Sequence, residues 1–157
     1  MRIGSLADLD ALAPLWRRFY EDQRAQGMRA QVPNNGFEEW AGSMRAALGR
    51  FACLIVAQDG PEIVGFVAGR VRGLPRYLGG ASAGWISEVW VEPTHRKLGL
   101  AEAMVRSALD WFGGQGMKRI ELQLVTGNAA ALELYKRLGF AEELVQMVLE
   151  APPRASS

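Results

Sequence analysis

The sequence predicts one α/β domain in which helices flank a mixed β-sheet. Two amphipathic helical patterns occupy residues 5–20 and 37–48, two β-prone segments joined by a tight turn span 51–71, and a strand–helix–strand succession covers 85–125. The tight turn implies antiparallel pairing, whereas the strand–helix–strand succession implies a right-handed parallel crossover. A sheet that contains both kinds of pairing follows.

Two helices are expected before any long strand. In residues 5–20 apolar side chains recur every three or four positions, which places them on one helical face; they are Leu6, Leu9, Leu12, Leu15, Trp16 and Phe19. Ser5 is expected to cap the free amides of this helix, and a very short strand to precede it at residues 2–3. The polar residues 21–36 are expected to form a loop or a broken helix, and residues 37–48 resume the helical pattern.

The rest of the chain is expected to alternate strands with turns and helices. Residues 72–84 carry four glycines and one proline, which predicts a loop. The expected elements are strands at 51–58, 62–71 and 85–91, a helix at 98–112 stopped by Gly113 and Gly114, a strand at 119–125, a helix at 128–138 and a strand at 140–149. Residues 151–157 are expected to be a disordered tail, so residues 1–150 make up the single domain.

Composition and charge exclude several classes of protein. The chain has 157 residues, 49% of them hydrophobic and 22% charged, as expected for a globular domain with a real core. Its net charge of +1 gives no overall attraction to nucleic acid or to a membrane surface. Its longest apolar run is far below the about 20 residues that span a bilayer, and no signal peptide is visible. With one cysteine and one histidine, the sequence predicts a cytoplasmic protein without disulfide or metal.

Residues 96–101 form a candidate phosphate-binding turn. They follow an expected strand and open an expected helix, where free backbone amides and the positive end of the helix dipole favour a pyrophosphate. Gly99 and Ala101 are small enough to let phosphates approach those amides. The patterns of P-loop and dinucleotide-binding proteins are both missing from the sequence. Alone, this turn supports only an anion site, and the alternative is that Gly99 simply eases a strand-to-helix turn.

Two motifs follow one another along the chain. The first is Val91-Glu92-Pro93 followed by Arg96-Lys97-Leu98-Gly99-Leu100-Ala101, and the second consists of Asn128, Tyr135, Gly139 and Phe140. With these motifs the sequence resembles the GNAT superfamily of acyl-CoA N-acyltransferases, whose signature is V-x-P, then [QR]-x-x-G-x-[GA]. Lys97 stands where the family usually has Gly, and Ala101 where Gly is commoner. Lys97 is expected either to contact a phosphate or to be a solvated surface lysine.

The resemblance implies the acyl-CoA N-acyltransferase fold, a mixed central sheet with splayed parallel central strands. Acetyl-CoA, as co-substrate, is then expected between these strands. The edge formed by Val89, Trp90 and Val91 is expected to bind the pantetheine arm, with Asn128 adding a contact besides capping its helix. The residues whose amides would hold the pyrophosphate are Arg96, Lys97, Leu98, Gly99, Leu100 and Ala101.

The resemblance also implies two catalytic residues, each with a plainer alternative. Tyr135 matches the family tyrosine that protonates the leaving thiolate, and its alternative is a core aromatic. Glu88 occupies a position where several members carry an acid that accepts the amine's proton or attracts a cationic substrate. Its alternative is a strand-end glutamate paired with an arginine such as Arg70.

The function expected from these motifs is transfer of an acetyl group from acetyl-CoA to a primary amine. The acceptor is not specified, and a small molecule is favoured over a protein amine. The alternatives are a non-catalytic acyl-CoA-binding regulatory module and a plain α/β interaction domain, and Tyr135 favours the enzyme because a sensor needs no thiolate-protonating phenol. Because members of the family often dimerise, a homodimer is one expected form.

Overall fold

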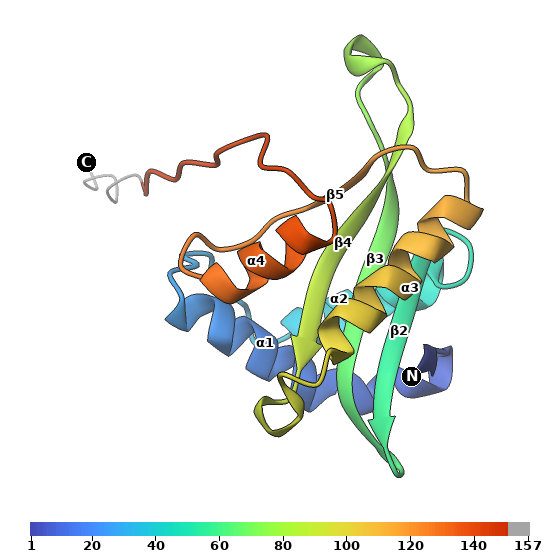
Figure 1. The fold of residues 1–157 in the computed structure, drawn as a ribbon, viewed down its shortest axis with the longest axis vertical. Coiled ribbons are helices and arrows are strands. Elements are labelled where there is room, and N and C mark those ends of the chain that lie inside the picture. Colours follow the sequence, from blue (N-terminus) through green and yellow to red (C-terminus); the bar gives the residue numbers. More distant parts are fainter. Residues whose placement is uncertain (151–157) are drawn as a thin grey trace, which may run out of the picture.

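The computed structural model describes residues 1–150 as a five-stranded mixed sheet with helices on both faces (Figure 1). The strands lie in the order in which they occur in the chain: β1 (Arg2–Ile3), β2 (Ala52–Asp59), β3 (Glu62–Gly73), β4 (Ser82–Val91) and β5 (Ile120–Leu122). Neighbours are antiparallel except β4 and β5, which are parallel. The predicted combination of a hairpin and a parallel crossover is confirmed.

Two helices cover each face of the sheet. Helices α1 (Ala13–Ala25) and α2 (Gly36–Ala47) bury their apolar stripes on one face, around Phe66 and Trp90. Helices α3 (Leu100–Gly114) and α4 (Ala129–Arg137) pack on the other, and α3 buries Phe112 there. Figure 1 shows α3 and α4 on the near side of the sheet and α2 behind it. Because the strands lie between two apolar layers, β2 is buried along most of its length.

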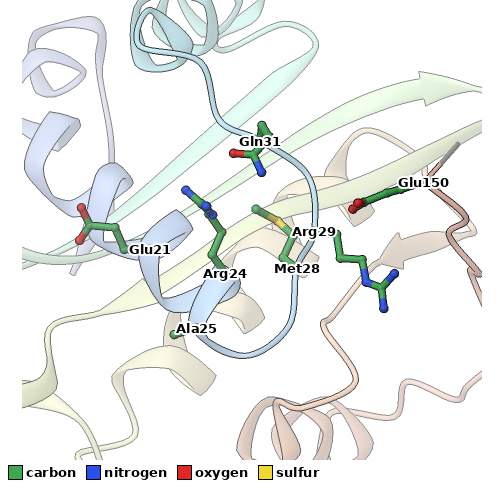
Figure 2. A pocket seen from close by; sticks show the side chains of 7 residues that line it. All are labelled: Glu21, Arg24, Ala25, Met28, Arg29, Gln31 and Glu150. Atoms are coloured by element: carbon green, nitrogen blue, oxygen red, sulfur yellow. The ribbon is translucent and has the colours of Figure 1, made fainter. Parts of the chain in front are cut away.

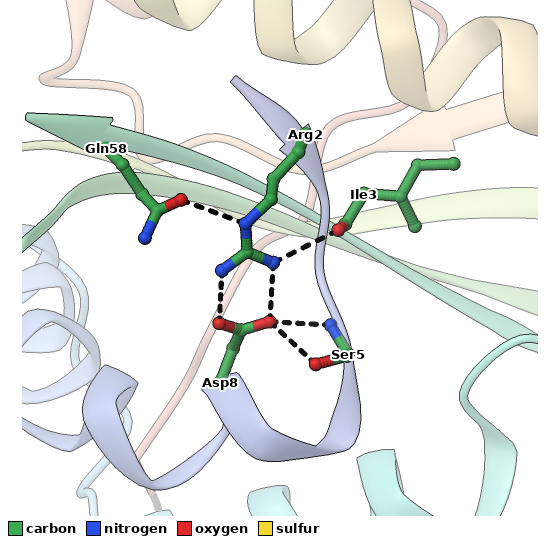
Figure 3. A network of polar contacts seen from close by, with 5 residues as sticks. All are labelled: Arg2, Ile3, Ser5, Asp8 and Gln58. Carbon is green, nitrogen blue, oxygen red and sulfur yellow. Dashed lines mark hydrogen bonds and ion pairs between the residues drawn. The ribbon is translucent and has the colours of Figure 1, made fainter. Parts of the chain in front are cut away.

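The N-terminal segment differs from the prediction. Short 3-10 turns at Leu6–Asp8 and Asp10–Leu12 precede α1, which therefore starts at Ala13 and continues through residues expected to form a loop. Ser5 is the N-cap of the first 3-10 turn, where it forms a capping box with Asp8, and its hydroxyl lies 3.0 Å from the Asp8 carboxylate. Asp8 also accepts from the Ser5 amide at 2.7 Å and from both terminal nitrogens of Arg2 at 2.8 and 2.5 Å (Figure 3). The Arg2 guanidinium thus holds the pKa of Asp8 well below its usual range.

Two glycine-rich segments are more regular than predicted. Strand β3 runs to Gly73 and β4 begins at Ser82, so the expected loop at 72–84 is only eight residues long and contains a 3-10 turn at Arg76–Leu78. Helix α3 likewise continues through the two glycines expected to stop it. It ends at Gly114 and is followed by Gly116, whose φ of +76° only a residue without a Cβ adopts easily.

The predicted strand at 140–149 is wrong, and β5 is shorter than the predicted 119–125. Residues 141–150 form no regular element, and Leu144 and Leu149 are exposed. This segment contacts the β5 region through side chains only, with Gln123 donating to Gln146 at 3.0 Å and Arg119 pairing with Glu143. Apolar alternation is not sufficient for a strand, because a strand also needs a ladder of backbone hydrogen bonds. The expected disordered tail at 151–157 lies outside the described residues.

Candidate active site

The parallel strands β4 and β5 diverge halfway along β4. They pair only between Gly84–Ile86 and Ile120–Leu122, and β4 then continues through Ser87 to Val91 without a partner on that side. A cavity of about 660 Å³ opens at the divergence, between β4, α4, the start of α3 and the second half of α1. All the residues expected to bind the co-substrate line it except Leu98, which is exposed. The splayed sheet predicted from the family resemblance is therefore present.

A β-bulge at Ser87 sets which side chains face the cavity. Ala68 pairs with Glu88 and Gly69 with Ile86, so Ser87 is the extra residue on β4. Without it, Ile86 and Glu88 would lie on one face of the strand. With it, Ile86 joins the α3 layer while Glu88 reaches Tyr20 of α1. Ser87 itself lines the cavity.

Glu88 is buried beside the cavity and does not line it. Only 2% of the residue is exposed, and its two oxygens accept hydrogen bonds from the Tyr20 hydroxyl at 2.9 Å and the Ser87 hydroxyl at 2.5 Å. Burial raises the pKa of Glu88, and the two hydroxyls oppose the rise. The alternative of an ion pair with Arg70 is not realised, since Arg70 donates to the Ser43 hydroxyl at 2.5 Å.

The turn before α3 presents backbone amides to the cavity. Gly99 is the N-cap of α3, and the first bond within the helix runs from Ala103 N to Gly99 O at 3.0 Å. The amides at 100–102 therefore have no acceptor within the helix. A Cβ at Gly99 would meet nothing within 4 Å, so it would stand in open space rather than in the protein core. This arrangement suits an anion that approaches the backbone closely.

Arg96 and Lys97, the two charged residues of this turn, differ in role: Arg96 anchors the turn through its side chain, whereas Lys97 has an unusual backbone conformation. The Nε of Arg96 donates to the Val91 carbonyl at 3.0 Å, and its guanidinium lies 4.8 Å from the centre of the Trp90 ring. The Arg96 side chain thus holds the turn against β4. Lys97 has a φ of +63°, the only positive φ of a non-glycine residue in the described chain. That left-handed backbone is the physical reason why a glycine suits this position.

Helix α4 brings Asn128 and Tyr135 to the cavity. Asn128 Oδ1 accepts from the Ala131 amide at 3.0 Å, which confirms the predicted helix cap. Tyr135 is 8% exposed, packs edge-on against Phe140 with ring centres 5.8 Å apart, and lines the cavity. Burial raises the pKa of Tyr135 to about 12. The phenol therefore stays protonated near neutral pH and can donate a hydrogen bond into the cavity.

Sequence reasoning missed two residues at the end of α1. Gln23 and the C-cap residue Gln26 line the cavity beside Asp22, but they fell in a segment expected to be a loop or a broken helix, so no helical face could be assigned to them. The neighbouring Glu21 belongs instead to the residues around a separate shallow groove, which also include Arg29 (Figure 2). Ser87 was missed because neither motif includes it and a bulge leaves no mark in the sequence.

The single histidine and the single cysteine have structural contacts. His95 ends the 3-10 turn Pro93–His95, lies between Asp59, at 3.2 Å, and Thr94, at 2.9 Å, and also lines the cavity. Cys53 is buried in the sheet. Within residues 1–150 no group of three or more metal-ligating side chains gathers, and no helix has the length and apolar character needed to cross a membrane.

Comparison with known proteins places these features in context. The model of the family described as "Acetyltransferase (GNAT) family" matches residues 9–140. A mycothiol acetyltransferase of Amycolatopsis mediterranei is 30% identical over 121 residues, 76% of this chain and 35% of that protein. An uncharacterized N-acetyltransferase of Methanocaldococcus jannaschii is 32% identical over 92 residues, 52% of this chain and 41% of that protein. The chain thus spans less than half the length of these relatives.

Solved structures share the fold. A predicted acetyltransferase from Clostridium acetobutylicum, solved with acetyl-CoA, has a TM-score of 0.78 and 18% identity, covering 95% of this chain and 94% of that one. An aminoglycoside N-acetyltransferase in complex with CoA has a TM-score of 0.71 and 14% identity, covering 98% and 93%. At these identities the likeness concerns the fold.

Proposed function

This chain belongs to the GNAT acetyltransferase family, and from that premise we propose that residues 1–150 form one N-acetyltransferase domain acting on a primary amine. The observation that carries the proposal is the cavity where β4 and β5 diverge. It joins the amide-presenting end of α3 to the phenol of Tyr135 on α4. An anion site and a proton donor in one cavity fit an acyl donor that carries a pyrophosphate.

The residues present fit acetyl-CoA. The amides around Gly99 would hold its pyrophosphate, and the unpaired edge of β4 at Val89, Trp90 and Val91 would hold its pantetheine arm. Lys97, which also lines the cavity, would add a positive charge. Asn128 uses its side-chain oxygen for the helix cap, which leaves its NH₂ group for a contact with the arm. When bound, acetyl-CoA supplies the activated acetyl group.

Acetyl transfer forms an N–C bond, breaks a C–S bond and releases one proton overall. The ammonium of the acceptor must lose a proton before it attacks, the nitrogen loses a second proton afterwards, and the departing thiolate gains one. In this proposal Tyr135, which lines the cavity, gives its proton to sulfur and recovers one from the nitrogen, directly or through water. Glu88, whose pKa burial raises, is the final acceptor of the first proton; because it does not line the cavity, that proton has to reach it through another group.

The acceptor end of the cavity favours a small, polar, cationic amine. Near the end of α1 the cavity is lined by Gln23, by Asp22, which has a carboxylate, and by Gln26, whose amide donates to that carboxylate. The relatives named for mycothiol and streptothricin, and the neighbours named for aminoglycosides, support the same class. A cytoplasmic location and a homodimer are further proposals, drawn from composition and from the family.

Two measurements test this proposal. Coenzyme A should raise the melting temperature, and acetyl-CoA with a panel of aminoglycosides, amino-sugar thiols, polyamines and peptides should release free thiol with at least one small amine. Binding without thiol release from any amine would favour the alternative, a regulatory module. A melting temperature unaffected by coenzyme A would favour a plain interaction domain.

A further inference from the structure

The buried carboxylate of Glu88 has one connection to the cavity. Glu88 is 2% exposed and does not line the cavity, so an amine held there cannot touch it. Ser87 does line the cavity, and its hydroxyl lies 2.5 Å from Glu88 Oε2. The other oxygen of Glu88 faces away, toward Tyr20 of α1 at 2.9 Å. Of the two residues whose hydroxyls bond to Glu88, Ser87 is therefore the one that also lines the cavity.

We propose that Ser87 takes a proton from the acceptor amine and passes its own hydroxyl proton to Glu88. The proposal rests on the acetyl transfer proposed above and adds to it the residue that touches the amine. An N–H bond of the ammonium breaks and an O–H bond forms at Ser87 Oγ. At the same time the original O–H bond of Ser87 breaks and one forms at Glu88 Oε2. The products are a neutral amine, an unchanged serine and a neutral carboxylic acid, which later returns its proton by the same path.

The surroundings of Glu88 suit a proton acceptor in this relay. Burial favours its neutral form, while the hydroxyls of Tyr20 and Ser87 and the charge of Arg70 favour its ionised form. Tyr20 is itself held by ring contacts with Trp16 at 4.5 Å and Phe19 at 4.9 Å, and burial raises its pKa. Tyr20 therefore remains a hydrogen-bond donor when Glu88 ionises.

The β-bulge is what makes the relay possible. Because Ser87 is the extra residue of β4, it lines the cavity while Glu88 bonds to Tyr20 on the α1 side. The Ser87 hydroxyl also lies 3.3 Å from the Ala68 carbonyl, so a purely structural role in holding the bulge is the competing explanation. The two explanations differ in their effect on the pH dependence of the reaction.

The test measures kcat/KM for the amine against pH in the full chain, with KM for acetyl-CoA measured alongside. Ser87→Ala and Glu88→Gln should each lower kcat/KM by about 10²-fold or more at neutral pH. Each should also remove the fall of kcat/KM at low pH, the acid limb of the profile, and leave KM for acetyl-CoA unchanged. The double variant should be no slower than either single one, because both remove one path. Ser87→Thr keeps a hydroxyl and should retain most of the activity and the limb.

Tyr20→Phe supplies an independent measurement. Removing a donor to the carboxylate raises the pKa of Glu88 further, so the acid limb should move to higher pH while the plateau rate changes little. If the wild type is active and Ser87→Ala keeps both its kcat/KM and the fall of kcat/KM at low pH, the relay is wrong while the proposal of acetyl transfer is unaffected. Losses that multiply in the double variant would also overturn it. A wild type that transfers no acetyl group would overturn both proposals together.

Discussion

Lys97 and Gly99 both hold a left-handed backbone, with φ of +63° and +76°, on either side of Leu98. Two left-handed residues within three positions make the chain turn sharply between β4 and α3. The first amides of the helix are then directed toward the cavity. A lysine in this conformation costs about 1 kcal/mol or more, whereas a glycine adopts it freely. The cost points to a function for the lysine side chain, and it can be measured.

Replacing Lys97 should separate charge from backbone strain. Lys97→Gly relieves the strained φ but increases the freedom of the unfolded chain, so the free energy of unfolding should change by no more than about 1 kcal/mol. Lys97→Asn, which also tolerates this φ, serves as the matched variant. Both should raise KM for acetyl-CoA several-fold, and the difference from wild type should shrink at high salt. An unchanged KM in both variants would identify Lys97 as a solvated lysine.

Gly99→Ala should weaken acetyl-CoA binding for a local reason. The added Cβ would stand in the open space before the amides and hold phosphates away. Gly60→Ala is a matched control, because Gly60 also has a positive φ, +56°, and open space around it but lies at the β2–β3 turn. Each variant should lose about 1 kcal/mol of stability. Only Gly99→Ala should raise the dissociation constant of coenzyme A, and a similar rise for Gly60→Ala would contradict the site.

Tyr135→Phe should lower kcat by about 10²- to 10⁴-fold while leaving the dissociation constant of coenzyme A nearly unchanged, because the hydroxyl acts on the leaving sulfur. Tyr77→Phe is the control, since Tyr77 is 86% exposed in the β3–β4 connection. With the pKa of Tyr135 raised to about 12, its ionisation should not appear in rate profiles below about pH 10. Wild-type turnover in Tyr135→Phe would remove it from the mechanism.

Much of this architecture follows from patterns that the sequence displays. Helical spacing located α2, and the alternation of apolar residues with a tight turn located the β2–β3 hairpin. The turn residues 96–101 and the cap at Asn128 were predictable because each depends on neighbours in the chain. The sequence therefore predicts well the features that depend only on residues close together in the chain.

The failures concern contacts that the pattern of one element does not contain. Ser5 caps a short 3-10 turn, through a capping box with Asp8, rather than the predicted long helix, and Asp8 also bonds to Arg2 on β1. For Glu88 the sequence left open a catalytic role and an ion pair with an arginine such as Arg70, and the bulge at Ser87 turns the side chain toward Tyr20. Neither a bulge nor the partner of a buried carboxylate can be read from a single segment, because tertiary packing decides both.

The Arg2–Asp8 contact should make stability fall in acid. The pKa of Asp8 is lowered in the folded chain, so its contribution is present above the ordinary pKa, near 4, and is lost as the pH falls toward the folded value. Asp8→Asn should lose about 1–3 kcal/mol at pH 7 and show a weaker decline between pH 5 and 2. Asp110→Asn, a carboxylate on α3, is the control. Parallel declines in wild type and Asp8→Asn would contradict the assignment.

Gly84→Ala should destabilise the sheet where β4 meets β5. A Cβ at Gly84 would lie 2.7 Å from the Phe112 ring, and one at Gly69 would lie 2.8 Å from it, so the two glycines form a notch that holds this ring of α3. Overpacking of this kind costs about 1–3 kcal/mol. The control is Gly73→Ala in the neighbouring strand β3, where an added Cβ would meet nothing within 4 Å. It should change the free energy of unfolding by less than about 0.5 kcal/mol.

A second substitution isolates the notch as the cause. Phe112→Leu shortens the ring that the new methyl would meet, so Gly84→Ala should cost less in the Phe112→Leu background than in wild type. Denaturant unfolding of the four chains gives the coupling energy directly. If the two changes add, the ring is not what excludes a side chain at Gly84, and the close packing of α3 on β4 would need another explanation.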